Sequence, residues 1–141
     1  MRKNKKLPKE LIIEKEYPFF SILILGTPWQ VRLLNKQEIL GEHKFDLKGC
    51  CCYSEYIIDL CYEGSLFVLE QTFYHEIAHS LTAHNIGSKD DALETINEEI
   101  MANSIGDGIA QLLRQDYPFH PKYSDKQKAK QIKDLLQAEY V

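Results

Sequence analysis

Apolar residues recur at intervals of three and four residues through the middle of the chain. Between positions 65 and 85 the repeating set is Leu66, Leu69, Phe73, Ile77 and Leu81. This spacing places an apolar stripe along one side of a helix. A Gly-Ser pair before the stripe and a glycine after it supply start and stop signals. The pattern therefore predicts a helix over residues 65–85 with one face against a core.

Two later stretches have the same helical period. One opens between Thr95 and Asn103 and continues to Leu113, and the other opens at Ser124 with a Ser-x-x-Gln capping box and runs to about residue 139. The first half of the chain instead has short runs rich in β-branched and aromatic residues. They predict a hairpin from 19–25 and 30–34 and a second strand pair from 50–53 and 56–60, with 38–47 ambiguous. Strands followed by helices indicate an α+β fold.

The predicted helix at 65–85 contains the pattern His75-Glu76-Ile77-Ala78-His79. Residues four apart on a helix differ by about 40° around the axis, so both imidazoles can reach one metal ion. Zinc hydrolases use this arrangement, in which the glutamate is the general base for a water molecule on the metal. We therefore expect His75 and His79 to bind Zn²⁺ and Glu76 to be catalytic. The alternative is a metal-free helix with two ordinary histidines.

Catalytic zinc usually has three protein ligands and an open position. A metzincin would need glycine at position 82 and histidine at position 85, where this chain has Thr82 and Asn85. The other histidines do not fit, because His84 would lie about 140° from His79 on one helix and the rest are isolated in the sequence.

Carboxylates remain as candidates for the third ligand. Glu98 and Glu99 stand at the start of the second predicted helix. A pair of glutamates there is also explained by the favourable charge at a helix N-terminus. The spacing alone leaves both residues open as ligands.

An HExxH helix followed by a glutamate-bearing helix resembles the gluzincin-type metallopeptidases. The pattern is most similar to small phage-borne or bacterial metallopeptidases and to the ImmA/IrrE-type group, whose second helix reads roughly E-x-x-A-N. Here that helix reads Glu99-Ile100-Met101-Ala102-Asn103. The resemblance implies Glu99 as the third zinc ligand and Asn103 as a residue that orients a ligand side chain. A thermolysin-like register would make Glu98 the ligand and would put Ala102 where an acidic partner is expected.

The resemblance also implies a fold and an activity. We expect a single zincin-like domain over 1–141, with a small, mostly antiparallel sheet packed on the HExxH helix, a Glu-bearing second helix and a C-terminal helix. The expected function is a zinc-dependent metallopeptidase that acts on a peptide or protein substrate. The alternative is a non-catalytic binding or regulatory protein with a structural metal site, because 141 residues leave little material for a deep cleft. Tyr74, Tyr117, Tyr123 and His120 are candidates for stabilising an oxyanion.

Composition narrows the partners and the compartment. The net charge is −4, and basic residues gather only at the two ends without interleaved aromatics, so we expect no nucleic-acid partner. The apolar run at 19–25 follows several glutamates and is too short to cross a bilayer. We therefore expect no membrane association and a cytoplasmic location.

Four cysteines, Cys50, Cys51, Cys52 and Cys61, have no paired C-x-x-C spacing. Successive strand residues face opposite sides of a sheet, so the triplet cannot meet one partner. We interpret them as reduced, half-buried strand cysteines rather than a disulfide framework or a second metal site.

Overall fold

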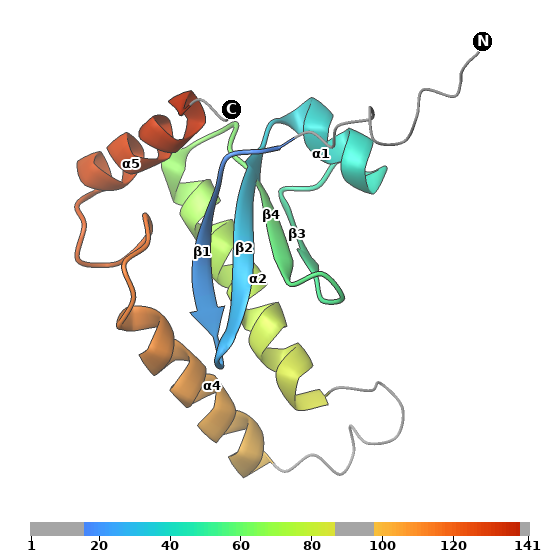
Figure 1. Cartoon of the computed structure of the whole chain (residues 1–141), viewed down its shortest axis with the longest axis vertical. Coiled ribbons are helices and arrows are strands. Elements are labelled where there is room, and N and C mark those ends of the chain that lie inside the picture. The colour runs from blue at the N-terminus through green and yellow to red at the C-terminus, as the bar shows by residue number, and fades with distance from the viewer. Residues whose placement is uncertain (1–15, 87–97, 139–141) are drawn as a thin grey trace.

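A computed structural model describes residues 16–86 and 98–138, with side chains described at 16–82 and 103–138. Figure 1 shows a sheet whose back is crossed by a long helix, with shorter helices around it. The elements, in chain order, are β1 (Phe19–Ile24), β2 (Thr27–Leu34), α1 (Lys36–His43), β3 (Gly49–Cys52), β4 (Ile57–Cys61), α2 (Leu66–Ile86), α4 (Glu98–Leu113) and α5 (Asp125–Gln137). The predicted α+β class is confirmed, and the expectations for 1–15 and Gly87 lie outside the described residues.

The four strands form one sheet in the order β1-β2-β4-β3. The β1–β2 and β3–β4 pairs are antiparallel, as the two predicted strand pairs require, but β2 and β4 pair in parallel. The sheet is therefore mixed, with antiparallel pairs in the majority. In this order β3 and β1 are the edge strands of the described sheet.

The turn of the first hairpin lies earlier than the sequence pattern indicates. A turn over 26–29 was expected, whereas Leu25 and Gly26 form a two-residue turn and both have positive φ, 49° and 84°. Two positive φ angles give the turn a twist that matches the flanking strands. Pro28 consequently lies inside β2, where the strand pairs only with β1, because pairing with β4 begins at Gln30. A proline without an N–H is tolerated in such one-sided pairing.

The ambiguous segment 38–47 contains most of α1. Asn35 Oδ1 accepts a hydrogen bond from Glu38 N at 2.8 Å, and Glu38 Oε1 accepts one from Asn35 N at 2.8 Å. This reciprocal capping box starts the helix, and Lys44 in the left-handed conformation ends it. Ile39 on α1 packs against Tyr17 and Leu34 in a small second core.

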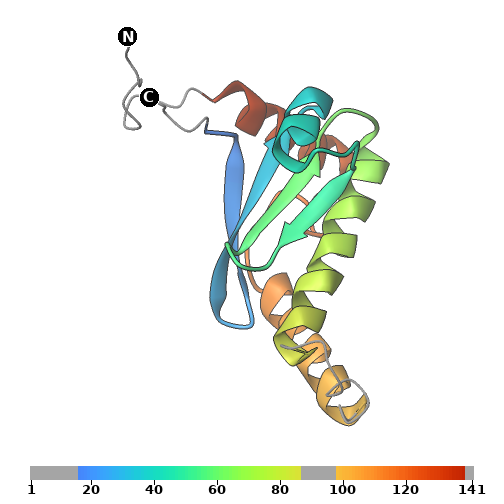
Figure 2. The same cartoon turned by 90° about the vertical axis from the view of Figure 1, so that its right-hand side faces the viewer.

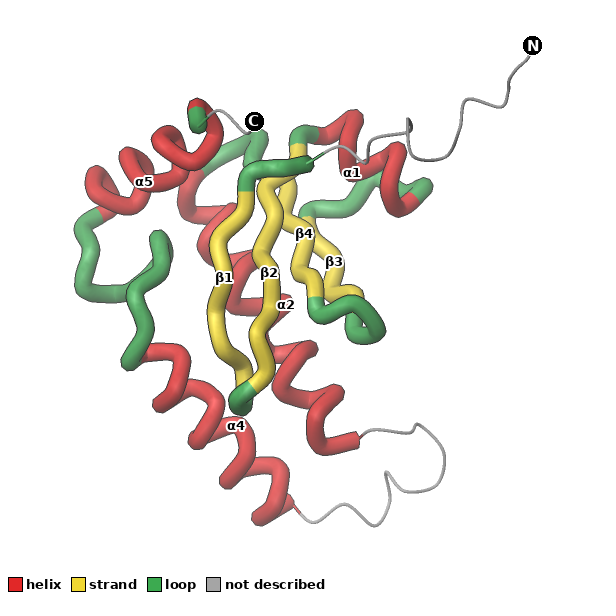
Figure 3. Tube along the Cα trace, viewed as in Figure 1, coloured by secondary structure: helices red, strands yellow, loops and turns green. Residues whose placement is uncertain are grey.

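The main core lies between the sheet and α2. One face of the strands supplies residues such as Val31 and Leu60, and α2 supplies the fully buried Phe73. Figures 2 and 3 show α2 running along this face of the sheet, with α4 beside the lower part of α2. No helix in the described ranges is both long enough and apolar enough to cross a membrane.

The last helix, α5, is tied to α2 and to the core. Lys128 Nζ on α5 donates to Glu70 Oε2 on α2 at 2.6 Å. The predicted capping box at Ser124 is confirmed, and Ile132 docks α5 on the core. These contacts place α5 at the N-terminal end of α2, away from its histidines (Figure 1).

Candidate metal site

The HExxH residues lie in the middle of α2. Ser65 Oγ accepts a hydrogen bond from Val68 N at 3.2 Å, so the serine predicted to start the helix does so. Two turns further on, the rings of His75 and His79 are both exposed, and their Nε2 atoms are 3.1 Å apart. Two nitrogens bound to one tetrahedral zinc at about 2.05 Å lie about 3.3 Å apart. The spacing of the histidine pair therefore fits a shared zinc ion with little change.

Glu76 points to a different side of α2 and is only 6 % exposed. Its Oε2 lies 3.3 Å from the position that a Cβ atom on Gly49 would take. Burial raises the pKa of the Glu76 carboxyl, and the nearby His79 and His75 lower it in part. A carboxylate with a raised pKa is better matched to proton transfer near neutral pH than an exposed one.

Gly49 allows β3 to lie directly on α2 beside the histidine pair. A Cβ at Gly49 would be 2.6 Å from Thr72 Cγ2, which is too close for a real contact. Around the helix axis, His79 lies about 20° and His75 about 60° from Thr72. The exposed histidines thus stand next to the helix face that supports the edge strand.

The free edge of β3 carries outward-facing backbone groups. Cys61 N donates to Lys48 O at 2.8 Å, so Lys48 and Cys61 are a hydrogen-bonded pair. Counting along the β3–β4 register from this pair, Cys50 and Cys52 are the next residues of β3 whose backbone groups bond to β4. Antiparallel pairs alternate between bonded and non-bonded residues. The N–H and C=O groups of Gly49 and Cys51 therefore point away from β4, and no hydrogen bond from a described residue reaches them.

The opposite edge of the sheet is partly covered. Gln115, just after α4, accepts from Leu23 N at 2.6 Å through Oε1 and donates to Leu23 O at 2.8 Å through Nε2. Gln111 on α4 accepts from Gly26 N at 3.0 Å. These side chains occupy the β1 edge as a neighbouring strand would. The β1 edge is thus closed at Leu23, whereas no side chain in the described ranges bonds to the outward backbone groups of Gly49 and Cys51 on β3.

The two candidates for the third ligand lie at the start of α4. Glu98 and Glu99 begin α4, and their side chains lie outside the described residues, as does the contact surface of Ala102. A side chain on Gly108 would collide with Leu81, so α4 meets α2 just after the histidine pair. Glu99 is nine residues before Gly108, roughly 13 Å along an α-helix.

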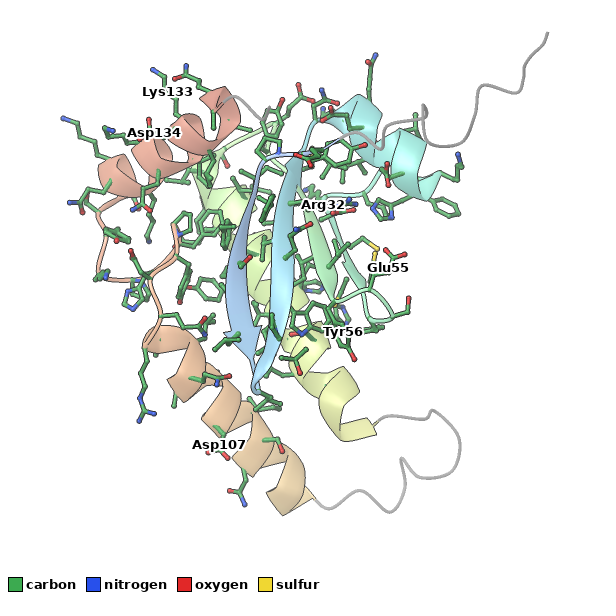
Figure 4. All side chains as sticks on the ribbon, viewed as in Figure 1. Arg32, Glu55, Tyr56, Asp107, Lys133 and Asp134 are labelled. Atoms are coloured by element: carbon green, nitrogen blue, oxygen red, sulfur yellow. The ribbon has the colours of Figure 1, made fainter. Side chains whose placement is uncertain are left out.

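Other groups on α4 do not replace this ligand. Asn103, predicted to orient a ligand, is exposed on α4. Asp107 is also exposed and points to the outside of the molecule (Figure 4). Within the described side chains, the histidine pair does not belong to a group of three or more metal-binding residues.

An apolar groove lies between α2 and α4 on the other side of the histidine pair. Its volume is about 270 Å³, and it is lined by Tyr74, Ile77, Ala78, Leu81, Thr82, Ile105, Ile109, Leu112 and Leu113. Ala78 precedes His79 directly, and Thr82 follows it by three residues on the neighbouring turn, so the groove reaches the pair. The histidines are therefore flanked by an open strand edge on one side and an apolar groove on the other.

The tyrosines considered as oxyanion stabilisers are engaged elsewhere. Tyr74 donates to Phe119 O at 2.9 Å and its hydroxyl is 3.2 Å from that of Tyr117. Tyr123 is hydrogen-bonded to Asp116, and the His120 ring contacts Leu113 O at 2.8 Å.

Tyr53, in the turn after β3, was not singled out by the sequence. Burial, followed by the charges of Cys51 and Glu76, raises the pKa of the Tyr53 phenol. The Glu76 charge contributes less to this rise than burial and Cys51 do, and the side chain is 46 % exposed. Nothing in the sequence pattern marks a turn tyrosine in this way, because its position depends on how β3 lies on α2.

Comparisons of the chain with protein-family models, with curated proteins and with solved structures find no match. We therefore argue function from the distances, burial and contacts of the described residues.

Proposed function

We propose that the protein is a zinc-dependent peptidase with a zincin-like site. The observation that carries the proposal is the 3.1 Å separation of the Nε2 atoms of His75 and His79 on exposed rings. A zinc ion held by this pair would supply a water of lowered pKa and would polarise the carbonyl of the scissile bond. Glu76 next to the pair takes the proton of the attacking water and delivers it to the leaving amine.

The substrate class follows from the open edge of β3. A peptide in extended conformation can pair with the outward N–H and C=O groups of Gly49 and Cys51 by strand addition. Because β3 lies on the Thr72 and Glu76 side of α2, such a peptide would pass beside His75. The apolar groove between α2 and α4 offers space for an apolar side chain of the peptide. Tyr53 is proposed as a donor to the oxyanion because it follows β3 directly and is about half exposed, and the Glu76 charge contributes to its raised pKa.

Glu99 is the proposed third ligand, with Glu98 as the alternative, on the residue pattern alone. The contact between Gly108 and Leu81 sets the register of the two helices. In this register the first turn of α4 lies roughly 13 Å along the helix from the contact with Leu81, and the zinc affinities of Glu99→Gln and Glu98→Gln variants test the assignment.

Zinc content and peptidase activity test the proposal together. Protein purified without added metal is expected to carry zinc, and one equivalent of it is expected to be lost in a His75→Ala/His79→Ala variant. With fluorescein-labelled casein as the probe, Glu76→Gln is expected to keep that zinc and to lower the rate at least about 100-fold. Tyr53→Phe is expected to keep the zinc and lower kcat by about 100-fold. Of Glu99→Gln and Glu98→Gln, only the first is expected to weaken zinc binding.

Two outcomes contradict the proposal. If the double histidine variant retains all bound zinc, the pair is not the metal site. If wild type and Glu76→Gln bind zinc equally and neither cleaves casein or a random peptide library, the protein is a non-catalytic zinc-binding protein. Gln71→Ala, an exposed position on the same helix, is the matched control and is expected to behave as wild type.

A further inference from the structure

A second group of metal-binding side chains lies on the outer face of the sheet, opposite α2. His43, Cys50 and Cys52 each offer one ligand atom, and these atoms all lie within 4.8 Å of one another. We call these three residues the outer-face cluster. None of them belongs to the HExxH motif, and the sequence had placed His43 in an ambiguous segment and the cysteines in a strand.

Two elements bring the outer-face cluster together. Cys50 and Cys52 are two residues apart on β3, so both face the same side of the sheet, while Cys51 between them packs against the main core. His43 is the last residue of α1, and the chain turns there through Lys44, whose φ is 67°. The end of α1 thus sets an imidazole over the two thiols.

A buried carboxylate orients the imidazole. Asp59, which is fully buried and opposite Cys50 in the register, lies 2.7 Å from His43 Nε2 through Oδ2. Its two oxygens also accept from Arg32 Nε at 2.6 Å and Nη2 at 2.8 Å. Figure 4 shows Arg32 on the side of the sheet turned to the viewer, away from α2. With Nε2–H held by Asp59, the second ring nitrogen of His43, Nδ1, is left for a ligand.

We propose that the outer-face cluster binds a Zn²⁺ ion through His43 Nδ1 and the thiolates of Cys50 and Cys52. Two sulfurs and one imidazole form a ligand set that zinc prefers, and a water molecule or an external ligand completes the tetrahedron. A carboxylate on the far nitrogen of a zinc-bound histidine is a recurrent supporting contact, and here Asp59 fills that role. Binding releases the two thiol protons.

Only small movements are needed for this site. Ligands of a tetrahedral zinc with bonds of about 2.1–2.3 Å lie about 3.4–3.8 Å apart. The three residues already bring one ligand atom each to within 4.8 Å of the others, and rotation of the half-buried side chains would adjust this spacing to that of a bound ion. A disulfide between Cys50 and Cys52 is a poorer use of the pair. Residues two apart in an extended strand have Cα atoms about 6.6 Å apart, at the upper limit for a disulfide.

The site has a structural consequence for the proposed peptidase, although it does not depend on that function. Cys50 follows Gly49, whose backbone lies against Glu76. An ion held between α1 and β3 would fasten the strand that forms the open edge. Zinc at the outer-face cluster is therefore expected to stabilise β3 whether or not the histidine pair on α2 binds metal.

Cobalt substitution tests the proposal on the full chain. Thiolate ligands give Co²⁺ an intense near-ultraviolet charge-transfer absorption that histidine and carboxylate ligands do not give. In the His75→Ala/His79→Ala variant, reduced with a phosphine, we expect one equivalent of Co²⁺ with this absorption and with the visible bands of a tetrahedral ion. Zn²⁺ is expected to displace it and to raise the thermal midpoint of unfolding.

Single substitutions assign the ligands. Cys50→Ser and Cys52→Ser are each expected to weaken Co²⁺ binding at least about 10-fold and to reduce the thiolate absorption, whereas Cys51→Ser and Cys61→Ser leave both unchanged. His43→Gln, which keeps a polar group beside Asp59, is expected to change the visible bands while circular dichroism stays native.

The proposal is overturned if the folded, reduced histidine-free variant shows no thiolate absorption, or if Cys51→Ser removes as much of it as Cys50→Ser. These readouts are independent of peptidase activity. Loss of activity in Glu76→Gln cannot produce either result, and loss of the cobalt absorption leaves the histidine pair on α2 untouched.

Discussion

At the scale of single residues, Glu76 is an ionisable carboxyl group in a buried position that disfavours its charge. A carboxylate that is 6 % exposed has lost much of its hydration, and this burial raises its pKa. Replacing it with the neutral isostere glutamine is expected to stabilise the metal-free protein by about 1 kcal/mol at neutral pH. Urea unfolding in EDTA measures the change.

Glu70 is the matched control on the same helix. Its carboxylate is half-buried and accepts from Lys128 Nζ at 2.6 Å, so its charge is compensated. Glu70→Gln is expected to be neutral or destabilising by up to about 1 kcal/mol. If both glutamine variants shift the unfolding midpoint in the same direction, the unfavourable burial of the Glu76 charge is not the cause of the effect.

Site residues that lie close together within one helix could be predicted from the sequence. Site residues that come together only when two elements pack could not. The His75 and His79 pair follows from four-residue spacing on one helix, and the structure places both Nε2 atoms within 3.1 Å. The close approach of Gly49 to Thr72 and Glu76, and the proposed role of Tyr53, depend on how β3 lies on α2. No local pattern encodes that approach, so neither residue could be selected in advance.

At the scale of elements, the contact between β3 and α2 depends on one glycine. A Cβ at Gly49 would meet Thr72 Cγ2 at 2.6 Å and the Asp59 carbonyl oxygen at 3.2 Å. Gly49→Ala is therefore expected to push β3 away from α2 and to destabilise the fold by about 1–3 kcal/mol. Denaturant unfolding gives the change in free energy.

Two further variants separate this clash from a general effect of alanine. Gly106 on α4 has open space where its Cβ would be, and Gly106→Ala is expected to stabilise the protein by about 0.5–1 kcal/mol. Thr72→Ser removes the clashing methyl group and is expected to recover part of the loss in the Gly49→Ala protein. Additive effects of the two substitutions would contradict a direct contact.

The starts of helices were predicted most accurately where a capping residue marks them in the sequence. Ser65 and Ser124 start α2 and α5 as the sequence indicates. The α1 segment was ambiguous because its apolar pattern is weak, although the Asn35–Glu38 capping box was present in the sequence. The hairpin turn was placed too late, since Pro28 suggested a break and the one-sided pairing that tolerates it is a tertiary feature.

At the scale of the whole molecule, the α+β class followed from the order of strand-like and helix-like segments, but the strand order did not. The parallel β2–β4 pair joins segments separated by α1 and β3. This long-range pairing creates both candidate sites. It makes β3 the edge strand beside the HExxH helix, and it aligns Arg32 with Asp59 beneath His43.

The folded molecule also keeps several weak acids protonated in its interior. Burial is the largest cause that raises the pKa of Tyr17, Cys51 and Cys52 to about 12, and it raises that of Tyr117 further. In the unfolded chain these groups ionise at their ordinary values of about 8.5 for cysteine and 10 for tyrosine. Above about pH 9 the unfolded state therefore binds fewer protons than the folded state, and the free energy of unfolding falls as pH rises. Urea midpoints measured in EDTA and phosphine between pH 7 and 11 are expected to decline steadily above pH 9.

Tyr117→Phe identifies one of the groups that cause this decline. The Tyr117 hydroxyl is hydrogen-bonded to the Tyr74 hydroxyl, which in turn donates to Phe119 O. Near pH 7 the substitution is expected to cost about 1 kcal/mol for the lost hydrogen bond. Above pH 10 the variant lacks one ionisation of the unfolded chain, so its stability falls less steeply, by about 1.4 kcal/mol per pH unit. The two stability curves are expected to converge as the pH rises, and curves that stay parallel would mean that Tyr117 ionises equally in both states.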